Sequence, residues 1–93
     1  NVQLKIREEF INKYVEKAIS NKEYDIYTTD KEGYTDMHYL ARYGYLEQFD
    51  KMLRAYPYFD MGMTAADGQT PAMLYLSSEL RNRIINAPQS SDK

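Results

Sequence analysis

The sequence has no cysteine and no tryptophan, and it has a single histidine among its 93 residues. Without cysteine the chain cannot form a disulfide, a thiolate metal site or a cysteine nucleophile. One histidine leaves only carboxylates as further metal ligands, and no calcium-loop spacing occurs among them. We therefore expect no metal site and no cofactor.

Glycine, proline and long apolar runs are also scarce, with four glycines and three prolines in the chain. The glycines are isolated, so no Gly-rich phosphate loop is present, and no Gly-x-Ser-x-Gly occurs. No apolar run reaches the roughly 18 residues that a membrane span requires. The first ten residues are charged and lack a continuous apolar core, so we expect no signal peptide there. We expect no membrane as a partner.

Excess positive charge is absent too, since the formal net charge is -2. Arginines and lysines do lie near aromatic residues, at Arg42-Tyr43 and at Lys51, Arg54 and Tyr56. These clusters do not form a continuous basic track, so solvated helix faces explain them better than a nucleic-acid site does. We expect no nucleic acid as a partner.

The only candidate catalytic base is His38, and no nucleophile and orienting acid are paired with it. Asp36 and Tyr39 are close in sequence, but neighbouring helical positions point in different directions. Ser77 and Ser78 are more typical of a helix junction than of a nucleophile. We therefore predict no catalytic residues and no enzyme activity.

Tyrosine is the residue type in excess, with ten copies. A tyrosine ring offers apolar area with a polar tip, which suits either a binding surface or a small core. The sequence leaves both interpretations open for each ring.

The first part of the chain alternates between helical and extended patterns. Residues 4–20 place apolar side chains at three- and four-residue steps, which predicts one helix. Its apolar face contains Ile6, Phe10, Ile11, Tyr14, Val15, Ala18 and Ile19. Residues 24–35 contain β-formers and then Gly33, which predicts a hairpin-like extended segment with a turn.

Two short helices are predicted next. Thr35 is a candidate N-cap for a helix over 36–43, and Gly44 is a candidate left-handed stop. A second helix is predicted from Leu46 to about Ala55, before Pro57. Residues 56–69 form a loop that contains the turn dipeptide Asp67-Gly68.

The pattern then restarts with Thr70 as a cap and Pro71 at a first helical position. Helical segments are predicted over 72–76 and 80–85, and these two segments either fuse or turn differently from the first pair. Pro88 ends the order, and residues 89–93 are predicted to be a disordered tail.

A 24-residue block from Asp30 to Leu53 reads DKEGYTDMHYLARYGYLEQFDKML. The order of Gly33, Thr35, His38, Ala41, Gly44, Leu46 and Glu47 in it resembles the signature of the ankyrin repeat. The resemblance implies an all-α fold, a stack of helical hairpins (an α-solenoid) with short hairpin-like fingers. It also implies a structural His38, bonded to the backbone and threonine of its turn. Asp36 and Leu40 depart from the family pattern, which has Pro and Ala at these places.

A second Gly-x-Thr turn lies 35 residues after the first, at Gly68-Gln69-Thr70. Ankyrin repeats have a period of about 33, so two extra residues are expected in the loop over 56–66. The resemblance thus implies a single domain over 1–88, which has an N-terminal cap at 1–29, one full repeat at about 30–64 and a C-terminal cap at 65–87. The last unit has Met73 in place of the histidine and Ser77-Ser78-Glu79 in place of the glycine turn.

In ankyrin-like chains the fingers and the exposed face of each first helix form a concave binding surface. Three of the corresponding residues, Tyr34, Arg42 and Tyr43, are of the types found in binding hot spots. Two alternatives stay open: Tyr34 packs on the neighbouring finger, and Arg42 pairs with Asp36 or Glu32. Carried over by position, the partner-binding residues are Thr29, Lys31, Glu32, Tyr34, Asp36, Arg42, Tyr43, Gln69 and Ser77, with Ala66, Asp67 and Ser78 at further matching positions.

The expected function is therefore that of a protein-protein interaction module that binds a partner protein and is a monomer as an isolated domain. The alternative is a non-catalytic targeting or regulatory domain of a larger enzyme, such as a microbial effector acting on a host protein. The start at Asn1 suggests a longer parent. The absence of cysteine fits an intracellular, cytoplasmic location, or the host cytoplasm for a secreted effector.

Overall fold

Helices occupy most of the part of the chain that is described. The computed structural model describes the backbone of residues 2–86 and the side chains of residues 7–85. The helices are α1 (Val2–Ser20), α2 (Asp36–Arg42), α3 (Leu46–Ala55) and α4 (Pro71–Asn86), and no strand occurs among these residues. The all-α class is thus confirmed for residues 2–86. Pro88 and the predicted tail over 89–93 lie outside the described residues.

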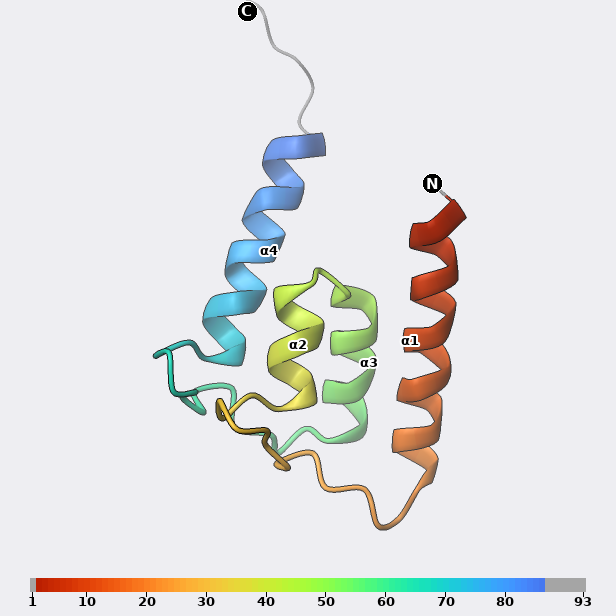
Figure 1. Cartoon of the computed structure of the whole chain (residues 1–93), viewed down its shortest axis with the longest axis vertical. Helices are drawn as coiled ribbons and strands as arrows, with labels where there is room; N and C mark the ends of the chain where they lie inside the picture. Colours follow the sequence, from red (N-terminus) through yellow and green to blue (C-terminus); the bar gives the residue numbers. More distant parts are fainter. Residues whose placement is uncertain (1, 87–93) are drawn as a thin grey trace, which may run out of the picture.

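The helices lie side by side in an order that differs from the chain order. Helices α2 and α3 form a central antiparallel pair, α1 lies beside α3, and α4 lies beside α2 (Figure 1). The spatial order is therefore α1, α3, α2, α4. Each terminal helix covers a different member of the central pair.

Helix α2 begins and ends next to the predicted capping residues, Thr35 and Gly44. The side chain of Thr35 accepts a hydrogen bond from the backbone N–H of His38, and the His38 ring binds the backbone N–H of Thr35 in return. Gly44 has a φ of +83°, and the amides of Gly44 and Tyr45 donate to Ala41 and Leu40. These are the two bonds of a Schellman motif, so Gly44 is confirmed as the helix stop.

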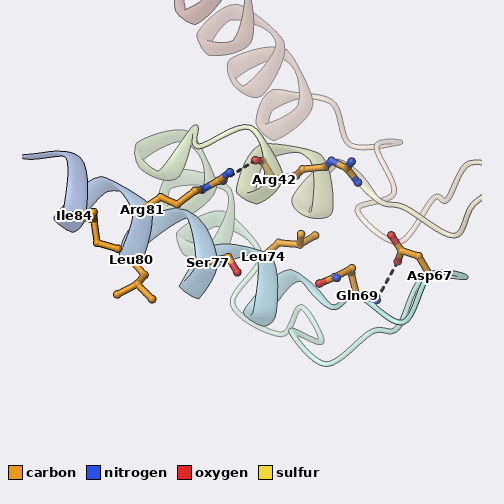
Figure 2. Close-up of a pocket in the computed structure, with 8 residues that line it drawn as sticks. All are labelled: Arg42, Asp67, Gln69, Leu74, Ser77, Leu80, Arg81 and Ile84. Atoms are coloured by element: carbon orange, nitrogen blue, oxygen red, sulfur yellow. Dashed lines mark hydrogen bonds between the residues drawn. The ribbon is translucent and has the colours of Figure 1, made fainter.

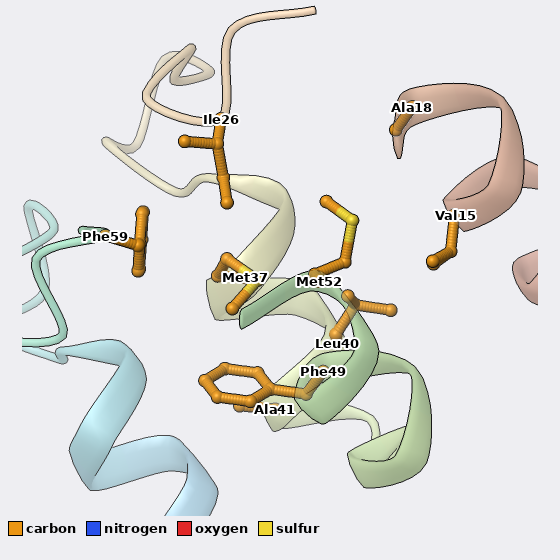
Figure 3. Packing of buried hydrophobic residues seen from close by; sticks show 9 residues of the cluster. All are labelled: Val15, Ala18, Ile26, Met37, Leu40, Ala41, Phe49, Met52 and Phe59. Atoms are coloured by element: carbon orange, nitrogen blue, oxygen red, sulfur yellow. The ribbon is translucent and has the colours of Figure 1, made fainter. Parts of the chain in front are cut away.

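The core lies between the central pair and its neighbours. Phe49 and Met52 of α3 and Met37 of α2 are its largest fully buried apolar side chains (Figure 3). Phe49 and Met52 are three residues apart, so they share one face of α3. Val15 and Ala18 close the core from the side of α1.

The apolar face predicted for the first helix is only partly buried. Val15 and Ala18 are buried and Ile11 is half-buried, but Phe10 is 70 % exposed and Tyr14 is 49 % exposed. The predicted apolar face is therefore only partly covered, and Phe10 and Tyr14 are its exposed members among the residues whose side chains are described. α1 extends beyond the short helix α3, so its N-terminal part has less of the molecule to pack against (Figure 1).

The loop over 21–35 lacks the predicted regular extended structure. Instead it closes successive turns, in which the amides of Tyr24, Thr28 and Gly33 donate to Asn21, Asp25 and Asp30. Side-chain oxygens of the loop's aspartates also cap the turns, as Asp25 does for the amide of Tyr27. Local bonds from aspartate compete with a strand, which explains why the β-formers here do not make one.

The loops and the helix starts that follow them repeat with a period of 35 residues. The loops between helices, 21–35 and 56–70, have equal length. The turn bonds of Tyr24, Thr28 and Gly33 recur 35 residues later at Phe59, Met63 and Gly68. The second loop, in which two extra residues were expected, is therefore no longer than the first.

The last unit contains one helix instead of two. α4 runs without interruption from Pro71 to Asn86, and it begins with a bond from the amide of Met73 to the Thr70 hydroxyl. Glu79 stands where Gly44 stands one period earlier. Glutamate favours the helix and disfavours a left-handed stop, so the two predicted segments fuse.

Candidate interaction surface

Two similar turns, finger 1 (residues 30–34) and finger 2 (residues 65–69), lie side by side. In each finger the first amide donates to the last carbonyl, at 3.0 Å from Asp30 to Tyr34 and 2.9 Å from Ala65 to Gln69. The amide of Ala66 donates to the carbonyl of Glu32 at 2.8 Å and joins the fingers. A Cβ on Gly33 would lie 3.2 Å from the backbone of Ala65, and the φ of +78° at this residue also favours glycine.

Tyr34 is buried between the fingers, with only 3 % of its surface exposed. Its hydroxyl donates to the Asp67 carboxylate at 2.6 Å and accepts from the Arg42 guanidinium at 2.9 Å. The guanidinium carbon also lies 5.7 Å from the centre of the Tyr34 ring. The prediction of Tyr34 as an open contact residue is therefore wrong, and the alternative, packing on the neighbouring finger, is confirmed.

The same contacts shift the pKa values of Tyr34, Asp67 and Arg42, which together form a polar cluster. The hydrogen bond from Tyr34 lowers the pKa of Asp67, and the bond to Asp67 raises the pKa of Tyr34. The contact with Tyr34 raises the pKa of Arg42. At neutral pH the cluster thus holds a carboxylate, a neutral phenol and a guanidinium in a defined arrangement.

An open groove of about 550 Å³ begins at this cluster and continues along α4. Figure 2 shows its position between finger 2, the end of α2 and α4. The Arg81 guanidinium crosses toward α2 and donates to the carbonyl of Arg42 at 3.4 Å and to the Ser78 hydroxyl at 3.0 Å. The lining residues are Arg42, Asp67, Gln69, Leu74, Ser77, Leu80, Arg81 and Ile84. This mixture of basic, polar and apolar side chains suits binding.

The structure brings some of the predicted contact residues together and separates others. Arg42, Gln69 and Ser77 line the groove, but Tyr43 lines a different pocket together with Phe10 of α1. Tyr43 nevertheless stays connected to finger 1, because its ring stacks on Tyr39, which packs on Tyr34. Other members of the predicted set, namely Thr29, Lys31, Glu32 and the further position Ala66, are exposed along the fingers outside both pockets.

Two further predicted positions are occupied by internal contacts. Ser78 is buried and its hydroxyl donates to the carbonyl of Ala41, so α4 is joined to α2 there. Asp36 is half-buried and accepts hydrogen bonds from the hydroxyls of Tyr14 at 2.6 Å and Tyr24 at 2.5 Å. Burial, and then the bond to Asp36, raises the pKa of Tyr14 to about 12 and raises that of Tyr24 further.

Most of the tyrosines connect one element of the stack to another. Five of their hydroxyls donate to aspartate side chains and two donate to backbone carbonyls. The aspartate pairs are Tyr14 and Tyr24 with Asp36, Tyr34 with Asp67, Tyr39 with Asp30, and Tyr75 with Asp50, and the carbonyl pairs are Tyr27 with Tyr58 and Tyr56 with Ala18. The tyrosines therefore fit neither a simple binding surface nor a simple core. Their rings pack where two elements meet, and their hydroxyls are bonded to polar groups.

His38 is fully buried and has a structural role. Its Nδ1 lies 3.1 Å from the amide nitrogen of Thr35 and its Nε2 lies 3.0 Å from the carbonyl oxygen of Met63. The ring thus connects the cap of α2 to the second loop. This confirms the structural assignment of His38. No cluster of three or more potential metal ligands occurs among the described residues.

The sequence interpretation missed Leu80, Arg81 and Ile84 as lining residues of the groove. They lie in the predicted helical segment 80–85, and the sequence left open whether this segment fuses with 72–76. The apolar spacing of Met73, Leu76, Leu80 and Ile84 was the available signal, because it continues one helical stripe through Ser77-Ser78-Glu79.

Comparisons with known proteins give no relative for this chain: no protein-family model, curated protein or solved structure matches it. Within residues 2–86, no helix is both long enough and apolar enough to span a membrane.

Proposed function

We propose that this chain is a non-catalytic protein-interaction module with ankyrin-like stacking, and that it binds a partner protein along the groove and the adjacent fingers. The 35-residue repetition of turns, caps and helices is the observation on which the proposal depends. Units that repeat in this way bury their apolar faces against one another and leave one edge open for binding.

The groove has the chemistry that such binding needs. Arg42 is held by Tyr34, so its guanidinium loses little conformational freedom when a partner contacts it. Leu80 and Ile84 supply exposed apolar area beside it, and Ser77 and Gln69 supply hydrogen-bonding groups. Arginine within a partly apolar surface is typical of hot spots.

A capture experiment with matched variants tests this proposal. Ser77 is exposed in the groove, so Ser77→Arg should fill it without disturbing the core. We expect wild type to capture a partner that Ser77→Arg does not, with the binding then measured on purified proteins. Lys13→Ala with Lys17→Ala, on the exposed face of α1, should bind like wild type.

The proposal fails if wild type and Ser77→Arg bind the same purified partner with equal affinity. Thermal melts of both proteins show whether Ser77→Arg is folded. A Tyr43→Ala variant tests separately whether the second pocket takes part in binding.

A further inference from the structure

The outward face of α4 is an apolar stripe that nothing in the described chain covers. It consists of Met73, Leu76, Leu80 and Ile84, which follow one another at three- and four-residue steps. Each of these side chains is between 49 and 69 % exposed. Figure 2 shows Leu80 and Ile84 projecting outward from α4, whereas Arg81 points to the end of α2. Four large apolar side chains in one exposed stripe are unusual for a free surface.

The internal repeat shows what kind of element covers this face. Thirty-five residues before Met73 and Leu76 lie His38 and Ala41, which are 0 % exposed on α2. The next unit covers them: the carbonyl of Met63 bonds the His38 ring, and Ser78 of α4 bonds the carbonyl of Ala41. The face of α2 is therefore closed by a loop and a helix, and the same face of α4 lacks both.

The printed sequence does not contain enough residues after α4 to supply such a unit. One unit takes 35 residues, and seven residues, 87–93, follow α4, with Pro88 among them. Proline is unfavourable inside a helix. The printed sequence after α4 is therefore shorter than the unit that covers the matching face of α2.

Charge beside the stripe restricts the chemistry of that helix. Leu80 and Ile84 line the same groove as Arg42 and Arg81, so the stripe and the two arginines are continuous. The acids nearby are already engaged, Asp67 by Tyr34 and Glu79 by Arg83 at 3.8 Å. Neither Arg42 nor Arg81 forms an ion pair with an acidic side chain of the described residues.

We propose that the outward face of α4 binds an amphipathic helix of a partner protein that has an apolar stripe flanked by carboxylates. The apolar side chains cover Met73, Leu76, Leu80 and Ile84, and a carboxylate reaches Arg81 at the groove edge. Arginine and carboxylate form the planar, two-bond pairing that fixes orientation as well as affinity. This inference rests on the proposed function and adds to it the chemistry and the secondary structure of the partner.

Designed peptides test the inference directly. One peptide is an amphipathic helix of about 18 residues with a leucine stripe and flanking glutamates, and its matched control has lysines at the same places. Fluorescence anisotropy of labelled peptides with the full chain should give at least about tenfold tighter binding for the glutamate peptide. The difference should shrink at about 0.5 M salt, where charges are screened within a few ångströms.

Variants of the chain locate the binding site. Leu80→Gln and, separately, Leu76→Gln should each weaken the glutamate peptide by about tenfold, because both side chains are exposed and central in the stripe. Arg81→Glu should reverse the preference toward the lysine peptide. Lys13→Glu on α1 is the matched charge control and should change nothing. Circular dichroism melts confirm that each variant is folded.

Equal binding of the two peptides, or no binding of either, overturns the proposal. So does a dimer in sedimentation that Leu80→Gln abolishes, because a second copy of the chain would then cover the stripe. Binding to anionic lipid vesicles that is lost in Leu80→Gln, without glutamate-peptide binding, identifies a membrane surface instead. If Ser77→Arg leaves partner binding unchanged while the peptides bind as expected, the part of the groove around Ser77 is rejected as a partner site and the inference about the α4 stripe and Arg81 still holds.

Discussion

Helices α2 and α4 begin alike and end differently. Each follows a threonine cap at the same place in the 35-residue repeat, Thr35 and Thr70. α2 stops at Arg42 before Gly44 and is largely buried, whereas α4 continues to Asn86 and presents its apolar stripe to solvent. A helix is therefore started by its own cap, but its burial depends on whether a neighbouring unit lies against it.

The largest change in the free energy of unfolding is expected for a variant of Phe49, a buried residue of α3, compared with a variant on the exposed stripe of α4. This ring is 1 % exposed, and its centre lies 4.9 Å from that of Tyr75. Phe49→Ala should lower the free energy of unfolding by about 3–5 kcal/mol, since it leaves a cavity in the core. Leu80→Ala, on the uncovered stripe, should change it by less than about 0.5 kcal/mol. Urea melts that give similar losses for both variants would break the comparison.

His38 and Met73 occupy equivalent positions in the two helices. His38→Ala should cost about 1–3 kcal/mol, because the amide of Thr35 and the carbonyl of Met63 lose their buried partner. Met73→Ala should have little effect, since Met73 is half exposed. Urea melts measure both changes. A loss for Met73→Ala as large as that for His38→Ala would mean that α4 is also covered in solution.

A variant of Gly44 tests why α2 ends at this position whereas α4 continues through the matching position. Gly44→Val should lower the free energy of unfolding by more than about 1 kcal/mol, because a β-branched residue is strained at a φ of +83°. No atom lies within 4 Å of the Cβ position, so backbone strain alone causes the loss. Gly62→Ala is the control, because Gly62 has no positive φ and little crowding. An unchanged urea midpoint for Gly44→Val would show that the turn does not depend on glycine.

The smallest change in the free energy of unfolding is expected where Tyr24 bonds Asp36 at the start of α2. The stability contributed by this bond should also depend on pH. Tyr24→Phe removes the bond to Asp36 and should cost about 1 kcal/mol at neutral pH. The pKa of Tyr24 is raised above 10.0, so the folded state favours the neutral phenol. The stability that the neutral Tyr24 phenol contributes to the folded state is fully present below pH 10 and is lost as the pH rises further.

Urea melts from pH 8 to about pH 11 should therefore show stability that falls above about pH 10, with a shallower fall for Tyr24→Phe than for wild type. Lysines also titrate in this range, so the difference between the two proteins is the informative quantity. Identical slopes would mean that the Tyr24–Asp36 bond does not form in solution.

Local signals in the sequence predicted the elements well. The threonine caps, the glycine stop and the bounds of α3 all depend on residues within one turn of one another. The structural role of His38 was implied by the family resemblance, and its ring also reaches Met63, 25 residues away. The groove was only partly predictable: Arg42, Gln69 and Ser77 were named, but Tyr34 was placed on the surface and Leu80, Arg81 and Ile84 were missed. These errors arise where two units meet, because the burial of Tyr34 depends on Asp67, a residue 33 positions away.

The sequence by itself determined where α2 and α3 start and stop and where α4 starts, because capping and left-handed turns are decided by backbone bonds over a few residues. Only the tertiary structure decided what each side chain contacts. Tyrosines that looked equivalent in the sequence became junctions to aspartates of other elements, and matching positions on α2 and α4 became buried or exposed. A side chain is buried only when another element packs against it, and the local sequence around that side chain does not specify the other element.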